Sequence, residues 1–424
     1  MATMDHPPLR GVTIKKKVLI TQQMVSSKYF ILENFSGILR RGKESVLLLL
    51  SACLVANVCL ARGNRLFVGK ETQKKVWFWE QIFGSYSSDY ALIHDLNKPH
   101  LIIDVIHYNV RTAHDRDAQN QKIKQYLERY KLGIERFKNL QKKAILKGSI
   151  EKRLYEVYGQ DRERLSNLFA GKVKVRSQIG LSDRFSEATK IAENYLPYME
   201  KIFVSEGLPK ELTRIAFVES MFQVNALSKV GARGVWQLMP GTARKYITVN
   251  RFIDERSSPI KATVAAAKFL RSNYEKLKSL PLAVASYNHG VYGILRAVKA
   301  TGSKNLDVIV RNYESPSFKF ASKNFYAEFI AAKNIYASKF LSGPHFQDNP
   351  LEIVEVDLPN KLAVSQLIRY TPLTETLIKR LNPCLQPLAF RKKYRTSPLL
   401  NGYSIFVPSR IAIQVKSKLK HIKL

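Results

Sequence analysis

One glutamate stands where a helix would otherwise present an apolar side chain. Within residues 209–220 the positions i, i+3, i+4 and i+7 are occupied by Leu212, Ile215, Ala216 and Glu219. In a helix these four side chains share one face, and three of them are apolar. A carboxyl group on such an inward face loses hydration, so its pKa rises. A neutral carboxylic acid can protonate a glycosidic oxygen, which is a poor leaving group until it is protonated.

The same spacing has a structural explanation. A buried glutamate paired with a basic residue, or a glutamate exposed at a helix end, would fit it equally, and most perturbed carboxylates are structural. Glu211 lies off the apolar face and is typical of an ordinary acid in the first helical turn. Periodicity alone therefore leaves the role of Glu219 open.

Four motifs follow one another around this helix. They are Val-Glu-Ser-Met-Phe at 218–222, Gly-Ala-Arg-Gly-Val-Trp-Gln at 231–237, Asp-Glu-Arg at 254–256 and Ala-Ser-Tyr-Asn at 285–288. Their order and spacing resemble the soluble-lytic-transglycosylase (SLT) family, most closely its membrane-bound lytic transglycosylase D type. The resemblance covers about residues 175–340. It implies a mainly α fold with a lysozyme-like, goose-type helical catalytic domain.

The resemblance also implies roles for individual residues. Glu219 matches the family's catalytic acid/base, and Ser220 matches a serine that supports the acid and the bound sugar. Gln237 matches a residue of the substrate cleft. Tyr287 and Asn288 match the pair that lines the cleft at the reacting sugar. Amide side chains suit this place because they offer both donors and acceptors to N-acetyl and hydroxyl groups.

A late family motif carries a tyrosine that contacts the acid. Here the simplest alignment puts Phe325 at that position and Tyr326 beside it, and we assign Tyr326 to the substrate-binding set. The sequence leaves open which of the two faces the cleft. Trp236 and Met239 are expected to pack in the core.

The implied reaction cleaves the β-1,4 bond between N-acetylmuramic acid and N-acetylglucosamine in peptidoglycan, with formation of 1,6-anhydromuramic ends. It needs one carboxylate, no metal and no cofactor. Two alternatives remain at this point. A hydrolytic muramidase shares the fold, and a non-catalytic wall-binding protein is disfavoured by the intact set of motif residues.

The charge of the chain favours a polyanionic partner. Lys and Arg number 69 against 34 Asp and Glu, which gives a formal net charge of +35. No zinc-finger spacing, basic-zipper heptad or RNA-recognition motif accompanies this charge, so no nucleic acid is expected. An anionic wall or membrane surface fits the same charge.

Residues 1–62 are typical of a basic N-terminus with an export signal. Residues 14–43 are basic, and an apolar run follows at 46–61 and ends in Cys-Leu-Ala. We therefore expect export to the periplasm, with membrane association as a further possibility through Cys53. The sequence leaves three alternatives open. Cys53 is lipidated, translation starts at Met24, or the apolar run is a buried core helix and not a signal.

Three further regions must position the site residues. We expect a mostly helical region at 65–180 with one short strand at 101–106, and a catalytic domain at 184–342. Within the latter, one helix is expected at 184–206 and another from Pro259 to Lys278.

The last region, 350–410, has a strand–helix–helix–strand pattern that resembles a lysin-motif (LysM) wall-binding unit. Its strands are expected at 351–356 and 401–408, and its helices at 361–370 and 374–381. We expect it to contribute wall affinity and no chemistry. The alternative is a small appendage that packs on the catalytic domain.

Overall fold

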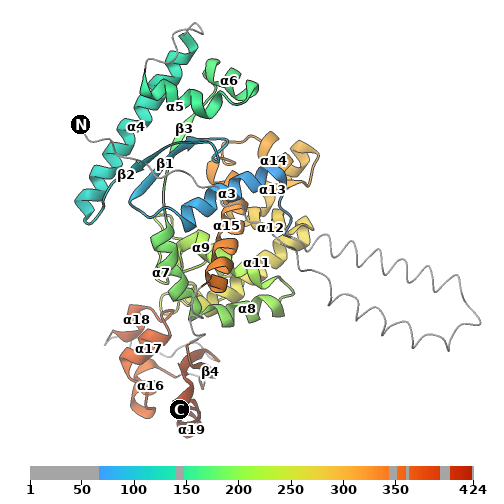
Figure 1. The fold of residues 1–424 in the computed structure, drawn as a ribbon. Helices are drawn as coiled ribbons and strands as arrows, with labels where there is room; N and C mark the ends of the chain where they lie inside the picture. The colour runs from blue at the N-terminus through green and yellow to red at the C-terminus, as the bar shows by residue number, and fades with distance from the viewer. Residues whose placement is uncertain (1–65, 140–147, 343–350, 360–361, 392–401, 423–424) are drawn as a thin grey trace, which may run out of the picture. The chain divides into compact units, whose positions relative to one another are not determined.

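The computed structural model describes residues 66–139, 148–342, 351–359, 362–391 and 402–422 of the 424-residue chain. The expected export segment at 1–62 lies outside these residues. Helices predominate, which confirms the predicted mainly α class (Figure 1). Within the described part of the chain, no helix is both long and apolar enough to span a membrane.

A bundle of helices surrounds the residues singled out by the motifs. Its elements are α7 (Ser182–Glu193), α8 (Leu196–Ser205), η1 (Lys210–Arg214), α9 (Ile215–Ser220), α10 (Pro240–Ala243), η2 (Glu255–Ser257), α11 (Pro259–Leu277), α12 (Leu280–His289), α13 (Val291–Thr301), α14 (Leu306–Asn312) and α15 (Phe320–Ser342). The single helix expected at 184–206 is divided in two. Helix α7 ends at Glu193, and α8 begins at Leu196 with Pro197 in its first turn. Proline suits that place because a first-turn N–H needs no helical partner.

Helix α11 begins and ends close to where the sequence predicts. The Ser258 hydroxyl accepts from the backbone N–H of Lys261 at 3.4 Å and caps the helix, and Pro259 occupies the first turn. The alanine-rich stretch at 262–267 is mostly buried, because small side chains allow α11 to pack closely on α8 and α12.

Helix α3 (Lys70–Gly84) belongs to the same core, although it precedes the predicted start of the catalytic domain. It packs along α15 (Figure 1). Phe78 and Phe83 are almost fully buried, and the Phe83 ring stacks on Phe185 of α7 with centroids 5.4 Å apart. The apolar core around the site therefore includes residues from both sides of position 184.

The region at 65–180 contains more strand than predicted. Besides α4 (Ala113–Asn139), α5 (Ser149–Tyr158) and α6 (Arg162–Phe169), an antiparallel sheet has the order β2-β1-β3. Strand β2 (Ile102–His107) confirms the expected strand at 101–106. Strands β1 (Tyr90–Asp95) and β3 (Val175–Ile179) were not expected, because such short strands give little periodicity and three helices separate them in the chain.

The C-terminal unit has the predicted order of elements, with two helices added. It comprises β4 (Ile353–Asp357), α16 (Val364–Tyr370), α17 (Glu375–Leu381), α18 (Pro387–Phe390), β5 (Ser404–Pro408) and α19 (Ser409–Lys420). Strands β4 and β5 pair antiparallel, with Glu355 opposite Phe406. Its apolar core includes Ile253, which comes from the loop before α11.

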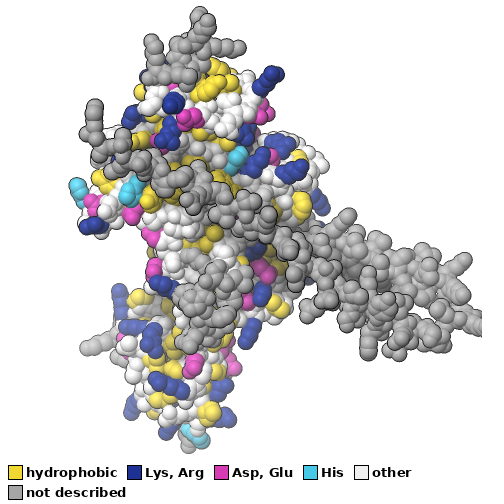
Figure 2. Space-filling model, in the orientation of Figure 1, with side chains coloured by type: hydrophobic (Ala, Val, Ile, Leu, Met, Phe, Trp, Pro, Cys, Tyr) yellow, Lys and Arg dark blue, Asp and Glu magenta, His cyan; other side chains and the backbone are white. Residues whose placement is uncertain are grey.

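Basic side chains are distributed widely over the surface. Figure 2 shows Lys and Arg over much of the visible face, without a single concentrated patch. On this face the positive charge is therefore spread over many elements.

Candidate active site

Glu219 lies at the end of a short helix that a sharp turn follows. Residues 210–214 form a 3₁₀ turn and α9 continues from it, so the single helix expected at 209–220 has two parts. Met221 and Phe222 both have positive φ angles, of 50° and 54°. Non-glycine residues seldom adopt this conformation, and two in succession mark a constrained turn. Phe222 is fully buried, which holds the turn in place.

The predicted apolar face of this segment is confirmed. Leu212, Ile215 and Ala216 are buried almost completely, and Glu219 is half-buried at the end of the same face. No hydrogen bond or ion pair to the Glu219 carboxyl occurs among the residues that the structure describes. The alternative of a glutamate neutralised by a basic partner therefore finds no support in this part of the chain.

The surroundings of Glu219 favour its protonated form. Burial, reinforced by the nearby charge of Glu328, raises the pKa of its carboxyl group to about 8. The carboxyl of Glu328 also has a pKa raised to about 8 by burial, while Arg176 acts in the opposite direction. Two carboxyl groups in one poorly hydrated region cannot both ionise easily.

Glu328 is a carboxyl group close enough to influence Glu219, and the motifs did not indicate it. It lies on α15 among Phe325, Phe329 and Ala332, which are buried. In helical spacing these are the i, i+3, i+4 and i+7 positions, with the acid at i+3. The spacing that singled out Glu219 would thus also have identified Glu328, had it been applied to residues 321–332.

The loop 231–238, which we call the substrate loop, is held by hydrogen bonds to its backbone carbonyls. Ser220 Oγ donates to the carbonyl of Val235 at 2.9 Å, and the Tyr287 hydroxyl donates to that of Trp236 at 2.8 Å. The Trp236 side chain is fully buried and donates to Thr263 at 2.8 Å. Three of the motifs are therefore brought together around this loop, and the prediction of a core role for Trp236 is confirmed.

Gln237 is placed by an unusual backbone conformation. Its φ is +45°, and its side-chain amide folds back to donate to the carbonyl of Gly234 at 3.0 Å. Gly234 itself has φ +75°, and a Cβ there would collide with the backbone carbonyl of Arg256. Only glycine fits this approach. The Gln237 side-chain oxygen remains the acceptor through which this residue can meet a sugar.

Tyr287 and Asn288 lie at the end of α12, next to α15. The Tyr287 ring lies parallel to that of Phe325, with centroids 6.3 Å apart and an interplanar angle of 5°. Burial, together with the charge of Glu219, raises the pKa of Tyr287 well above its ordinary value. Asn288 is exposed, and its side-chain oxygen accepts from Ser322 at 2.8 Å.

Tyr326, which the sequence assigns to the substrate-binding set, has other neighbours than this group. Its side chain is 3% exposed, and its hydroxyl donates to the carbonyl of Phe67 at 2.9 Å. One step along a helix rotates a side chain by about 100°, so Phe325 and Tyr326 face different neighbours. Phe325 is the one that meets Tyr287. Met239 was expected in the core and is 44% exposed.

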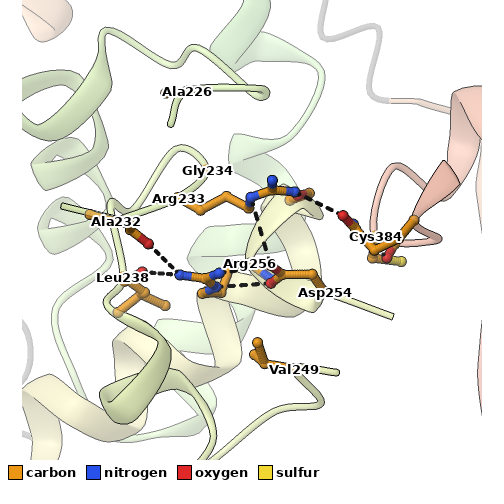
Figure 3. A network of polar contacts seen from close by, with 12 residues as sticks. Ala226, Ala232, Arg233, Gly234, Leu238, Val249, Asp254, Arg256 and Cys384 are labelled. Atoms are coloured by element: carbon orange, nitrogen blue, oxygen red, sulfur yellow. Dashed lines mark hydrogen bonds and ion pairs between the residues drawn. The ribbon is translucent and has the colours of Figure 1, made fainter. Parts of the chain in front are cut away.

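The Asp-Glu-Arg motif secures both ends of the substrate loop (Figure 3). Arg256 Nη1 donates to the carbonyl of Gly231 at 2.7 Å and to that of Leu238 at 3.0 Å. Asp254 holds the same guanidinium by two hydrogen bonds, of 2.9 and 2.7 Å. Charge-assisted bidentate pairs of this kind have a fixed geometry. Among the residues described, no three His, Cys, Asp or Glu side chains are grouped to hold a metal ion.

Residues 200–310 match the family model described as "Transglycosylase SLT domain". The chain is also similar to "Membrane-bound lytic murein transglycosylase D" of Escherichia coli (strain K12), with 31% identity over 120 residues. These residues are 28% of this chain and 26% of that protein. A "Putative tributyltin chloride resistance protein" of Alteromonas sp. (strain M-1) is 31% identical over 115 residues, 27% of this chain and 56% of that one. The chain thus spans about a quarter to just over half of these relatives.

Two solved structures resemble this chain, with lower sequence identity than the relatives above. An inactive mutant of the lytic transglycosylase Slt from Pseudomonas aeruginosa matches with a TM-score of 0.32 and 21% identity, over 46% of this chain and 31% of that one. The soluble lytic transglycosylase SLT70 of Escherichia coli matches with a TM-score of 0.29 and 16% identity, over 48% of this chain and 37% of that one.

Proposed function

We propose that this protein is a peptidoglycan lytic transglycosylase with Glu219 as its catalytic acid/base. The reaction cleaves the β-1,4 bond between N-acetylmuramic acid and N-acetylglucosamine and leaves 1,6-anhydromuramic ends. One observation carries the proposal. Inside the segment that matches the SLT domain, a half-buried carboxyl group that has no hydrogen-bond or ion-pair partner among the described residues has a pKa raised to about 8. Such a group is a proton donor at neutral pH.

The chemistry consists of two proton transfers at Glu219, one from its carboxyl group and one back to it. Glu219 donates its proton to the glycosidic oxygen as the bond from that oxygen to C1 of the muramic residue breaks. The carboxylate then accepts the proton of the muramic 6-hydroxyl, whose oxygen bonds to C1 of the same sugar. Glu219 is thereby returned to its acid form, and no water is consumed. Because the nucleophile belongs to the substrate, its effective concentration is high and no second carboxylate is required.

The other site residues position the substrate. We assign Asn288 as a donor to the sugar, because Ser322 already occupies its side-chain oxygen. Gln237 offers its free side-chain oxygen from the substrate loop. Ser220 and Tyr287 hold that loop through its carbonyls, so they fix its distance from Glu219.

A hydrolytic muramidase is the alternative that the product must exclude. Glycosidases that use water commonly place two carboxyl groups around the scissile bond. Burial raises the pKa of Glu328 to about 8, so at neutral pH this carboxyl group is mostly protonated and is not a ready base for water. Glu219 as the acid is common to both reactions, so the product distinguishes them.

Digestion of purified peptidoglycan tests the proposal. Mass spectrometry of the released fragments should show anhydromuramic ends, which are lighter than reducing ends by one water, and Glu219→Gln should release neither. Reducing muramic acid as the main product would support the muramidase instead. A folded protein that releases no fragments at all would support the non-catalytic wall-binding alternative.

The remaining assignments concern location and partners. We propose that the basic and apolar segment at 1–62 directs export to the periplasm, in line with the membrane-bound relative, and that the positive surface contacts anionic wall or membrane groups. We further propose that the C-terminal unit contributes wall affinity. A chain lacking residues 351–424 should then sediment less with insoluble peptidoglycan. Equal sedimentation would favour a purely packing role for this unit.

A further inference from the structure

The C-terminal unit is joined to the catalytic core through backbone hydrogen bonds. The backbone N–H of Asp254 donates to the carbonyl of Cys384 at 2.7 Å, and that of Gln386 donates to the carbonyl of Phe252 at 2.8 Å. Ile253 forms a β-bridge with Leu385, and its side chain is 1% exposed within the apolar core of the C-terminal unit. Residues 252–254, which we call the docking segment, therefore belong structurally to both parts.

A buried lysine reinforces this junction. Lys261 of α11 is 8% exposed, and its Nζ donates to the Ser404 carbonyl at 2.7 Å. It also lies 3.3 Å from Glu255 and 3.2 Å from Glu355, and its Nζ lies over the ring of Tyr403 at 4.2 Å. A buried ammonium group is costly without such partners. Ser404, Glu355 and Tyr403 belong to the C-terminal unit, so the contact is built into the fold.

The docking segment also reaches the substrate loop (Figure 3). Asp254 fixes Arg256, which holds the carbonyls at both ends of the loop. Arg233, inside the loop, has its Nε 3.6 Å from Asp254 and donates through Nη1 to Gln386 of the C-terminal unit at 3.1 Å. The substrate loop therefore contacts the C-terminal unit directly, through Arg233 and Gln386, and indirectly, through Arg256 and Asp254.

We propose that the C-terminal unit positions the substrate loop, with Gln386 as a positioning residue that acts through Arg233 and Asp254. The sequence pattern predicts a unit that contributes wall affinity and no chemistry, whereas these contacts give it a part in turnover. The expected effect on catalytic activity rests on the proposed function. The restraint of residues 231–238 by Gln386 does not depend on that function.

The test compares three variants of the full chain on a short soluble glycan fragment, for which wall affinity is irrelevant. Gln386→Ala removes the acceptor for Arg233, and kcat/KM should fall by about threefold to tenfold, as expected for a hydrogen bond to a charged group that is one of several restraints. Gln386→Glu keeps an acceptor and should stay within about twofold of the wild type. Gln414→Ala, at an exposed position of α19, is the matched control and should change nothing.

Hydrogen exchange of the loop amides provides the readout that is independent of activity. In Gln386→Ala the amides of 231–238 should exchange faster, while those of α11 and the melting temperature stay close to the wild type. A Gln386→Ala protein with wild-type kcat/KM and unchanged exchange of the loop would overturn the inference. Equal losses in Gln386→Ala and Gln386→Glu would do the same, since the glutamate retains the contact. If the wild type cleaves nothing, the proposed function fails, and the exchange result alone decides whether the loop is restrained.

Discussion

Replacement of Glu219 by glutamine removes a proton donor while keeping the size and polarity of the side chain. If Glu219 serves first as acid and then as base, both halves of the reaction fail in this variant. General acid–base catalysis contributes about 10²–10⁴-fold to a rate, so kcat should fall at least that far. The fold should survive, because a neutral amide replaces a carboxyl group that is neutral in the folded protein at pH 7.

The raised pKa of Glu219 sets how the wild type should depend on pH. At pH 7 a carboxyl group with a pKa of about 8 is about 90% protonated, whereas one with its ordinary value of 4.5 is about 0.3% protonated. The protein therefore increases the acid form about 300-fold at this pH. Activity should stay high up to about pH 8 and decline above it, as the proton donor is lost.

The same shift affects stability. Because the folded pKa of Glu219 lies above the unfolded value, its contribution to stability is fully present below about pH 4.5 and is lost as the pH rises through about 8. Glu219→Gln removes this titration. Its melting temperature should therefore decline less than that of the wild type between pH 5 and pH 8.

The assay is the rate of anhydromuramic release from peptidoglycan, measured from pH 5 to pH 9, with a melting curve at each pH. Glu211→Gln is the matched control, since Glu211 lies earlier in the same segment and off its apolar face, so its replacement should have no effect on the rate. A folded Glu219→Gln protein with wild-type activity would refute the mechanism. If the activity of the wild type already declines near pH 5, the carboxyl group of Glu219 does not keep its proton at neutral pH, and the raised pKa is refuted.

Three further results are expected. Glu328→Gln removes the charge that adds to burial in opposing ionisation of Glu219, so the alkaline limb of the pH–rate profile should move to lower pH; a limb that stays in place would show that burial alone sets the pKa. Tyr326→Phe removes the hydrogen bond to Phe67 and should cost about 1 kcal/mol of stability with kcat/KM unchanged; a selective loss of kcat/KM would support the assignment of Tyr326 to the substrate-binding set. Deletion of residues 44–61 should leave the protein in the cytoplasm in a cell-fractionation experiment, and periplasmic accumulation of the deleted form would contradict the export assignment.

Local helical spacing singles out Glu219 as the candidate acid, and the same kind of spacing occurs around Glu328. Glu219 was found because its neighbours at i−3, i−4 and i−7 are apolar, a pattern that depends on helix geometry alone. Glu328 shows the same kind of pattern on α15 and was missed, although no new information was required. Strands β1 and β3 are a different case, because their pairing joins segments that α4, α5 and α6 separate in the chain.

The choice between Phe325 and Tyr326 could not be made from the sequence. Both are aromatic, both are buried, and an alignment error of one residue exchanges them. The ring of Phe325 meets Tyr287 only because α12 packs on α15 in one particular orientation. Such an orientation results from many contacts that no short motif contains.

The sequence by itself determined the residue types that the site contains and the helix that carries the acid. Both follow from local periodicity and from motifs whose residues lie within a few positions of one another. Only the tertiary structure decided that a second carboxyl group lies near Glu219, and that Gln386 contacts a loop residue 153 positions earlier. The physical reason is that burial, electrostatic coupling and loop restraint depend on distances in space, and chain folding sets these distances between residues that are remote in sequence.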